Sequence, residues 1–422
     1  NGISGNGQST ACNWNMDWER PVNMEYFVPE NGMYKMVLNQ ECEFKISGGF
    51  SRAYGGDDKW QMKSSFTLKS GKLYEGLNSF DYPLFEKAKA FNKYKVFKVR
   101  NGGNDTYVRL TDAAFHEIYR RSNFNINYQC WQPAHIFMNG EYLGMLNLRE
   151  ANNKYFAEGE YGIDTDDVDQ FELNGELGYE QKTGSKDSFM NWLNRTKELA
   201  LDPTNEALWQ AVCEVVDVDE FCNYMAAEIY MGGGDWLTNS NNIKGFANPA
   251  NGGKYHLVMF DLDSTYGSTN MIQSVFDLLH RYDHRYADNN GVSYLAEILF
   301  NMLQYEPFKK QFIDAFCIVA GSVLEPARCK EIIDEILRKL IANHIGLELN
   351  TAGLKYGLSF AHPQIEVLKR YRELGGEIIT IGSDAHTASR VGQYSSDACE
   401  ILKDIFGYVC TFENRTPIFH KL

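Results

Sequence analysis

Two short apolar runs flank the dipeptide Asn139-Gly140 in the stretch "AHIFMNGEYLGMLNLRE", residues 134–150. Asn and Gly accept the positive φ values of a type I′ turn, so this stretch predicts a tight β-hairpin. Apolar and aromatic alternations broken by glycine, in residues 34–54 and 59–71, predict further hairpin strands. The first part of the chain is therefore expected to be rich in antiparallel strands.

The pattern becomes helical in the middle of the chain. Residues 107–121 carry apolar side chains at helical spacing. From about Met190 the residue pattern again predicts helices, through "DEFCNYMAAEIYMGG". A loop rich in Gly and Asn follows, then a strand, "KYHLVMFDLD", and helices over 290–340. We therefore expect an α+β fold with a β-rich N-terminal lobe (1–155) and a mainly helical lobe (156–334).

The last 80 or so residues change character. "IGLELNTAG" and "EIITIGSDAH" are typical of buried strands, whereas "HPQIEVLKRYRELGG" and "SSDACEILKDIFG" are typical of helices. Strands that alternate with helices indicate βαβ units and a parallel sheet. We expect a separate segment over residues 335–422, with a boundary somewhere between about 326 and 340.

Composition excludes several classes of protein. The net charge is −15, so the chain lacks the broad basic surface that nucleic acids or anionic membranes require, and any bound phosphate must be held locally. Nine scattered cysteines without a C-x-x-C pair indicate neither a zinc framework nor a disulfide scaffold. No apolar run approaches the roughly 18 residues that a membrane-spanning helix needs.

Five polar residues within thirty positions form the candidate chemical site. They lie on a helix-to-loop-to-strand segment and are Asp235, Asn241, Asn242, Asp261 and Asp263. Phosphoryl transfer needs an acid that accepts the proton of the attacking hydroxyl, and a metal, usually Mg²⁺, that neutralises the phosphates. Carboxylate and amide oxygens suit Mg²⁺. The competing interpretation is that Asp and Asn in loops only satisfy nearby backbone groups.

From about residue 44 to 316 the chain resembles the CotH (spore coat protein H) kinase family, an atypical protein-kinase-like group. Six stretches carry the resemblance, in the order of the family: "FKISGGFSRAY", "KSSFTLKS", "YPLFEKAKAFNKYKVFKVRNGGND", "IFMNGEYLGMLNLRE", "GGGDWLTNSNNIKGF" and "YHLVMFDLDSTYG". The resemblance implies a two-lobed kinase-like fold that transfers the γ-phosphate of ATP to a protein hydroxyl with Mg²⁺ or Mn²⁺. It also suggests a place at the cell surface or outside the cell.

The resemblance assigns roles to the five candidate residues. Asp235 would be the catalytic-loop acid, and Asn241 or Asn242 its metal-binding amide. Asp261 would be the principal metal ligand, with Asp263 beside it.

Three further residues would contact the nucleotide. Glu150 would be an acid of the nucleotide-binding lobe, and Arg52 and Lys63 would contact phosphates. The sequence departs from the family here, since the turn reads "GGFSR" and Ser64-Ser65 follows the lysine. A catalytically inactive kinase fold that serves as a surface binding or structural protein is therefore the alternative.

Residues 335–422 resemble the C-terminal part of a histidinol-phosphatase of the PHP superfamily, on the stretches "LELNTAGLKYG", "ELGGEIITIGSDAH" and "TPIFHKL". That family folds as a β/α barrel and hydrolyses a phosphate monoester at a metal cluster, and Asp384 and His386 match its last ligands. Its first ligands form an H-x-H pair, which these 422 residues lack. We therefore do not expect phosphoesterase activity here. A natural fusion and an assembly artefact would both explain the tail.

Overall fold

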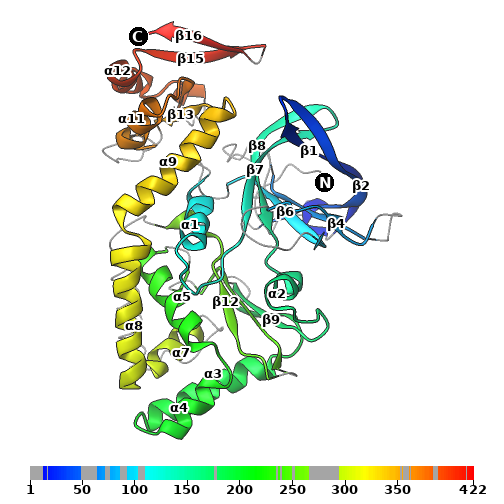
Figure 1. Cartoon of the computed structure of the whole chain (residues 1–422), viewed down its shortest axis with the longest axis vertical. Helices are drawn as coiled ribbons and strands as arrows, with labels where there is room; N and C mark the ends of the chain where they lie inside the picture. The colour runs from blue at the N-terminus through cyan, green and yellow to red at the C-terminus, as the bar shows by residue number, and fades with distance from the viewer. Residues whose placement is uncertain are drawn as a thin grey trace.

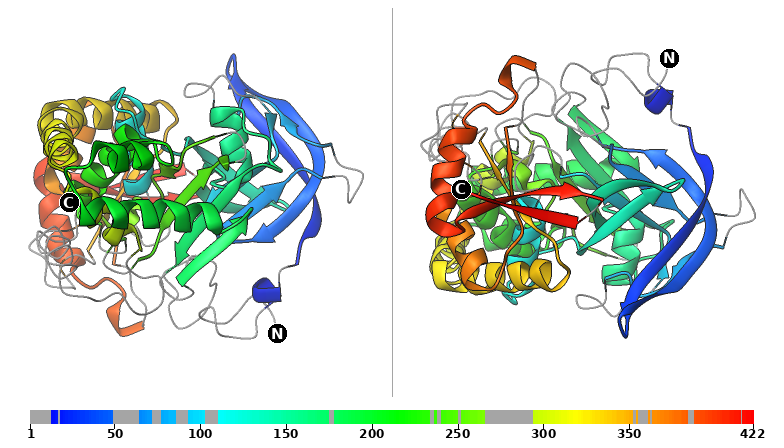
Figure 2. Two further views of the ribbon diagram at one scale, coloured as in Figure 1. Left: turned by 90° about the horizontal axis from the view of Figure 1, so that it is seen from below. Right: turned by 90° about the horizontal axis from the view of Figure 1, so that it is seen from above.

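The computed structural model describes residues 13–16, 18–48, 64–71, 77–85, 93–102, 110–174, 178–233, 236–237, 240–249, 252–265, 294–351, 354, 361, 363–383, 388–414 and 416–422. Figure 1 shows a strand-rich N-terminal part beside a column of helices, with the C-terminal segments at one end of the long axis. The views from below and above in Figure 2 place the N-terminal sheet and the helices α8 and α9 on opposite sides of the molecule.

The N-terminal part is a six-stranded antiparallel sheet in the order β1-β2-β3-β6-β8-β7. The strands are β1 (Arg20–Glu30), β2 (Met33–Ile46), β3 (Phe66–Lys69), β6 (Val96–Arg100), β7 (Trp131–Met138) and β8 (Glu141–Glu150). The predicted turn is confirmed, because Asn139 and Gly140 have φ values of 50° and 82° and β7 pairs with β8. The short strands β4 (Phe80–Asp81) and β5 (Lys93–Tyr94) and the 3-10 turn η1 (Asn13–Met16) lie beside the sheet.

Helix α1 (Thr111–Arg120) confirms the helical spacing of its segment and lies in the chain between β6 and β7. Its first turn carries the buried Asp112, and its apolar side packs Phe115 and Ile118 into the main core of the following region. The helix thereby connects the sheet region to the rest of the molecule.

The middle of the chain combines helices with a second sheet. The helices are α2 (Lys154–Tyr161), α3 (Asp187–Leu201), α4 (Glu206–Cys213), α5 (Val218–Met231), α7 (Tyr294–Met302) and α8 (Glu306–Ile318). The sheet is antiparallel in the order β10-β9-β11-β12, with β9 (Asp169–Asn174), β10 (Gly178–Thr183), β11 (Ile243–Ala247) and β12 (His256–Val258). Fully buried aromatic residues, including Phe171, Trp192 and Phe308, form the main core.

Two residues determine where helix α5 begins and ends. The Asp217 side chain accepts a hydrogen bond from the Glu220 N–H and caps the start of α5, and Gly232, at φ 65°, ends the same helix.

In β11, a Cβ at Gly245 would lie 2.6 Å from a ring carbon of Phe171. Glycine is therefore required for β11 to pack against β9.

The C-terminal segments follow α9 (Pro326–Ala342), which is joined to α8 by a π-helical turn, η5 (Val319–Val323). Strands β13 (Leu347–Asn350) and β14 (Ile379–Gly382) pair in parallel, so the expected parallel pairing is confirmed. Helices α11 (Ile365–Glu373) and α12 (Ser395–Ile405), the turn η6 (Ala388–Arg390) and the hairpin of β15 (Tyr408–Glu413) with β16 (Thr416–Lys421) complete this part.

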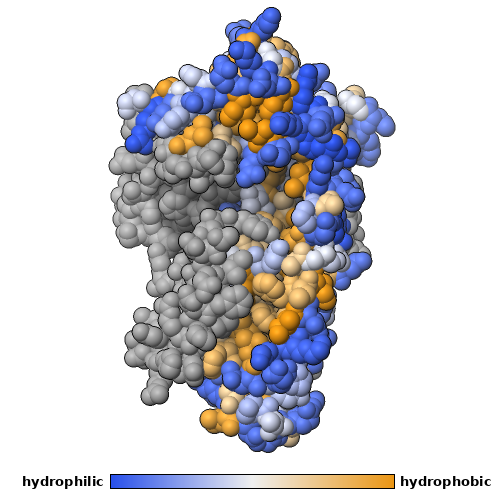
Figure 3. Space-filling model, turned by 90° about the vertical axis from the view of Figure 1, so that its left-hand side faces the viewer, coloured by the Kyte–Doolittle hydropathy of each residue, from blue (hydrophilic) through white to orange (hydrophobic). Residues whose placement is uncertain are grey.

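The mixed architecture confirms the expected α+β class. No described helix is long and apolar enough to span a membrane. Figure 3 shows the face formed by the helix column, where hydrophobic residues gather between hydrophilic ends; Ile313 and Ile318 of α8 are among the exposed apolar residues.

Candidate functional site

Asp261 and Asp263 lie directly after β12, at the 3-10 turn η4 (Leu262–Ser264). Their side chains are 26% and 3% exposed. Asp261 has φ 60° and ψ 54°, a left-handed conformation that is uncommon for residues other than glycine and clusters at functional sites. The backbone therefore turns sharply at the acid that was expected to be the main metal ligand.

Arg100, the last residue of β6, reaches across to both acids. One guanidinium nitrogen, Nη2, donates to Asp261 Oδ1 and, at 2.8 Å, to Asp263 Oδ2. Burial disfavours the charged guanidinium, but the carboxylates of Asp261, Asp112 and Asp263 raise the pKa of Arg100 above its ordinary value. The six-stranded sheet and the turn after β12 of the four-stranded sheet are thus connected by ion pairs at the candidate site.

Asp112 is the buried centre of the same cluster. Its Oδ1 accepts from the Leu262 N–H at 2.9 Å, and its Oδ2 lies 2.6 Å from Arg149 Nη2 and 3.6 Å from Arg100 Nη1. Burial opposes ionisation, but Arg149, Arg100 and His116 hold the pKa of Asp112 well below its usual range. This hydrogen bond from the Leu262 N–H attaches the turn of Asp261 and Asp263 to the start of α1.

Two lysines flank the aromatic ring that precedes Asp261. Lys244 Nζ lies 4.2 Å and Lys98 Nζ 5.7 Å from the centre of the Phe260 ring. Lys244 also pairs with Glu172 at 3.0 Å. Burial, helped by the charge of Lys244, lowers the pKa of Lys98 to about 8. This arrangement supplies cations beside the acids, as a phosphate group would require.

Asn241 and Asn242 precede β11, next to the end of β12. Lys244 pairs with Val258. Val258 is the last residue of β12, so the loop with Asn241 and Asn242 joins β11 at the end of the ladder where β12 stops. Asn242, like Ser240, has a positive φ (56° and 49°), so the loop is held in an uncommon conformation beside the acids.

The other predicted site residues divide into two groups. Glu150 ends β8 and is buried, and its carboxylate accepts from the Cys130 N–H at 3.2 Å. Its strand position is level with Phe97, the residue before Lys98. Five residues lie outside the described residues: Arg52, Lys63, Asp235, Asp384 and His386.

The residue that follows Asp235 is nevertheless well anchored. Trp236 is buried and its indole N–H donates to the Tyr224 hydroxyl at 2.9 Å. Tyr224 belongs to helix α5. Glu228, one turn before the end of this helix, is a buried acid whose Oε1 has no hydrogen-bond partner among the described residues. Burial, together with the nearby charge of Asp112, raises the pKa of Glu228 well above its ordinary value.

Sequence reasoning missed five residues of the cluster, namely Lys98, Arg100, Asp112, Arg149 and Lys244. The "FKVR" pattern did contain a signal, because residues two apart on a strand share a face. Lys98 and Arg100 therefore had to point the same way. Which acids they would meet could not be inferred from this pattern.

The donor set fits a divalent cation. Carboxylate oxygens of Asp261 and Asp263 converge on one cationic group, the Arg100 guanidinium, and hard oxygen ligands are those that Mg²⁺ prefers. A metal that took Asp261 Oδ1 and Asp263 Oδ2 as ligands would need the guanidinium to move, since Arg100 donates to these two oxygens.

A second acid and histidine group lies elsewhere. Ligand atoms of Asp217, Glu220 and His256 lie within 4.8 Å of one another. The Glu220 carboxylate accepts from the Leu257 N–H at 3.0 Å and from the Tyr161 hydroxyl at 2.9 Å, and His256 Nδ1 lies 2.8 Å away. These bonds already connect α5 with β12 and α2, so the group is explained as a structural connection.

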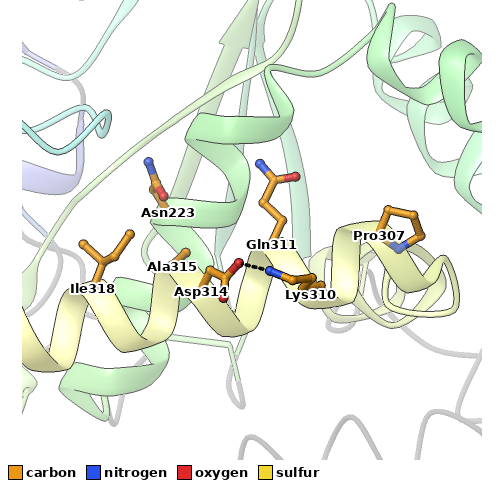
Figure 4. Close-up of a pocket in the computed structure, with 7 residues that line it drawn as sticks. All are labelled: Asn223, Pro307, Lys310, Gln311, Asp314, Ala315 and Ile318. Carbon is orange, nitrogen blue, oxygen red and sulfur yellow. Dashed lines mark hydrogen bonds and ion pairs between the residues drawn. The ribbon is translucent and has the colours of Figure 1, made fainter.

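A pocket of about 290 Å³ lies between α5 and α8 (Figure 4). Its lining includes Asn223, Gln311 and the ion pair of Lys310 with Asp314, 2.6 Å apart. None of the residues in the acid cluster lines it. The pocket is therefore separate from the acid cluster.

Comparison with known proteins identifies the family. The model of the family described as CotH kinase protein matches residues 52–371, which is more than half of the chain. The chain therefore belongs to the CotH kinase protein family, and the resemblance seen in the sequence is confirmed. The match also continues past about residue 316, where the resemblance seen in the sequence ends.

Two curated relatives carry a different name, probable histidinol-phosphatase. The protein from Thermotoga maritima is 33% identical over 127 residues, which is 30% of this chain and 53% of that protein. The protein from Clostridium acetobutylicum is 32% identical over 89 residues, which is 21% of this chain and 31% of that protein. The chain thus spans about half or less of the relatives it matches.

Proposed function

We propose that this chain is a metal-dependent atypical protein kinase that transfers the γ-phosphate of ATP to Ser or Thr of a surface or coat protein. The observation that carries the proposal is the meeting of β6 with the loop after β12, where Lys98 and Arg100 face Asp261 and Asp263. Kinase-like catalysis needs cations and metal-binding acids from two parts of the fold at one place. The two sheets supply them, as the two lobes of a kinase-like fold would.

The nucleotide phosphates would bind beside Phe260. Lys98 and Lys244 both lie over this ring, and the lowered pKa of Lys98 shows a poorly solvated ammonium that a phosphate would stabilise. Lys98 is thus a candidate for the phosphate contact that sequence reasoning gave to Lys63. Arg52 and Glu150 remain candidates for the nucleotide side.

The metal would be held by Asp261 and Asp263, with Asn241 or Asn242 adding an amide oxygen. Bound Mg²⁺ or Mn²⁺ would neutralise charge on the transferred phosphate. Asp112 keeps the turn of Asp261 in place through the Leu262 N–H. Asp235, next to the anchored Trp236, would accept the proton of the attacking hydroxyl.

The test is calorimetric titration of the whole chain with ATP in the presence of Mg²⁺ or Mn²⁺, followed by ATP consumption. Asp261→Asn should weaken metal-dependent binding at least about 100-fold, since even indirect partners of a metal contribute 10–100-fold. Asp187→Asn, at the exposed first turn of α3, removes the same charge and should change nothing. Absence of nucleotide binding with either metal would refute the proposal.

The second candidate is a non-catalytic binding or structural protein of the same fold. The observation that favours it is the ion pairing of Arg100 with both acids, which gives each carboxylate a cationic partner from the chain itself. Phosphate transfer to a generic protein acceptor would exclude it. Phosphoester hydrolysis by the C-terminal segment rests only on the relatives' name and on Asp384 and His386, and the missing H-x-H pair speaks against it.

A further inference from the structure

We propose that Arg100 is a built-in counter-cation that competes with the divalent metal for Asp261 and Asp263. This inference rests on the proposed metal-dependent function and adds a step to it. In the structure the guanidinium bridges both carboxylates, and a metal would take the same two oxygens only when Arg100 gives up these bonds.

The geometry of Arg100 supports competition. A single nitrogen, Nη2, donates to both acids, so the guanidinium occupies the point on which their oxygens converge. Its side chain is only 13% exposed, so little water screens it from a second cation at the same oxygens. A metal and this guanidinium in one place would repel each other strongly.

Asp112 offers Arg100 an alternative carboxylate partner. Its other terminal nitrogen, Nη1, lies 3.6 Å from Asp112 Oδ2, beyond ordinary hydrogen-bond length. A small rotation towards Asp112 would shorten this contact while Nη2 leaves Asp261. The guanidinium would then keep a buried carboxylate partner, as a buried charge requires.

The charges of the cluster explain why metal binding would be sensitive to this residue. Asp112, Asp261 and Asp263 face the guanidinium groups of Arg100 and Arg149, and Lys98 adds a positive charge near Asp261. Removing Arg100 takes away the cation nearest to Asp261 and Asp263, which raises the attraction of these carboxylates for a divalent cation.

The experiment titrates Mn²⁺ into the nucleotide-free whole chain by calorimetry. Arg100→Gln should bind Mn²⁺ at least about tenfold more tightly than wild type, because one nearby positive charge is gone. Arg195→Gln removes the same charge from α3, where Arg195 pairs with Glu214 at 2.8 Å, and should match wild type. Arg100→Lys keeps the charge without the planar fork and should fall in between.

Unfolding is monitored by circular dichroism in parallel. Arg100→Gln should lose thermal stability without metal and gain more from Mn²⁺ than wild type does, as tighter ligand binding requires. If wild type binds Mn²⁺ and folded Arg100→Gln and Arg100→Lys bind it equally or more weakly, competition is refuted and the proposed kinase function stands. If neither wild type nor Arg100→Gln binds Mn²⁺ without nucleotide, this inference fails, whereas the proposed function is decided separately by the titration with ATP.

Discussion

Replacing Asp112 by Asn should destabilise the fold strongly, because Asp112 neutralises a buried cation. Arg149 is 2% exposed and its Nη2 lies 2.6 Å from Asp112 Oδ2. Two other nitrogens of Arg149, Nε and Nη1, have no hydrogen-bond partner among the described residues. The substitution keeps size and shape, and Asn can still accept from the Leu262 N–H, so the change removes mainly the charge.

The magnitude follows from the cost of an uncompensated buried charge. Breaking a buried ion pair by removing one partner costs about 3–5 kcal/mol, whereas replacing both partners with apolar groups is close to neutral. We therefore expect Asp112→Asn to lower the free energy of unfolding by about 3–5 kcal/mol. The double variant Asp112→Asn with Arg149→Met should recover a large part of this loss, since no buried charge remains unpaired.

Urea unfolding followed by circular dichroism measures both variants against wild type. The slope of the free energy with urea should stay unchanged if only stability is affected. A loss below about 1 kcal/mol for Asp112→Asn would place this pair among exposed salt bridges. That result would refute the view that the charge of Asp112 compensates the buried guanidinium of Arg149. Failure of the double variant to recover stability would refute the charge-based explanation specifically.

Two further substitutions test burial and packing. Glu228 has a folded-state pKa above its unfolded value, so its stabilising contribution is complete below the unfolded pKa and is lost as pH rises through the folded pKa. The stability of Glu228→Gln relative to wild type should therefore increase in thermal unfolding as pH rises above the unfolded pKa of Glu, about 4.3, and a flat difference would contradict this. Gly245→Ala would force a Cβ against Phe171 and should cost about 1–3 kcal/mol, whereas Gly321→Ala, with open space around it, should be nearly neutral.

Local structure was predictable wherever a short pattern decides the conformation. Asn139-Gly140 accepts positive φ, so the hairpin followed from two residues. The helical spacing before Arg121 gave α1, and the alternating patterns of the tail gave a parallel strand pair. These features depend on neighbours along the chain and need no knowledge of distant contacts.

The clustering of the site was not predictable in the same way. Arg100 and Asp261 are 161 residues apart and meet only because the fold brings the end of β6 to the turn after β12. The strand expected to run through "KYHLVMFDLD" ends at Val258, because the backbone leaves the sheet and reaches positive φ at Asp261. Strand propensity cannot report such a turn, since the Asp112 carboxylate that accepts from Leu262 comes from α1.

Helix α9 bears on whether the C-terminal segment can be treated as separate. Ile332 and Ile336 of this helix pack into the main core with α1, α5 and α8, whereas Leu337 and Leu340 pack into the core of the tail. One helix therefore completes two cores. A cut near residue 335 would expose apolar side chains on both products, so any attempt to isolate the kinase-like part should retain all of α9 and replace the two leucines with polar residues.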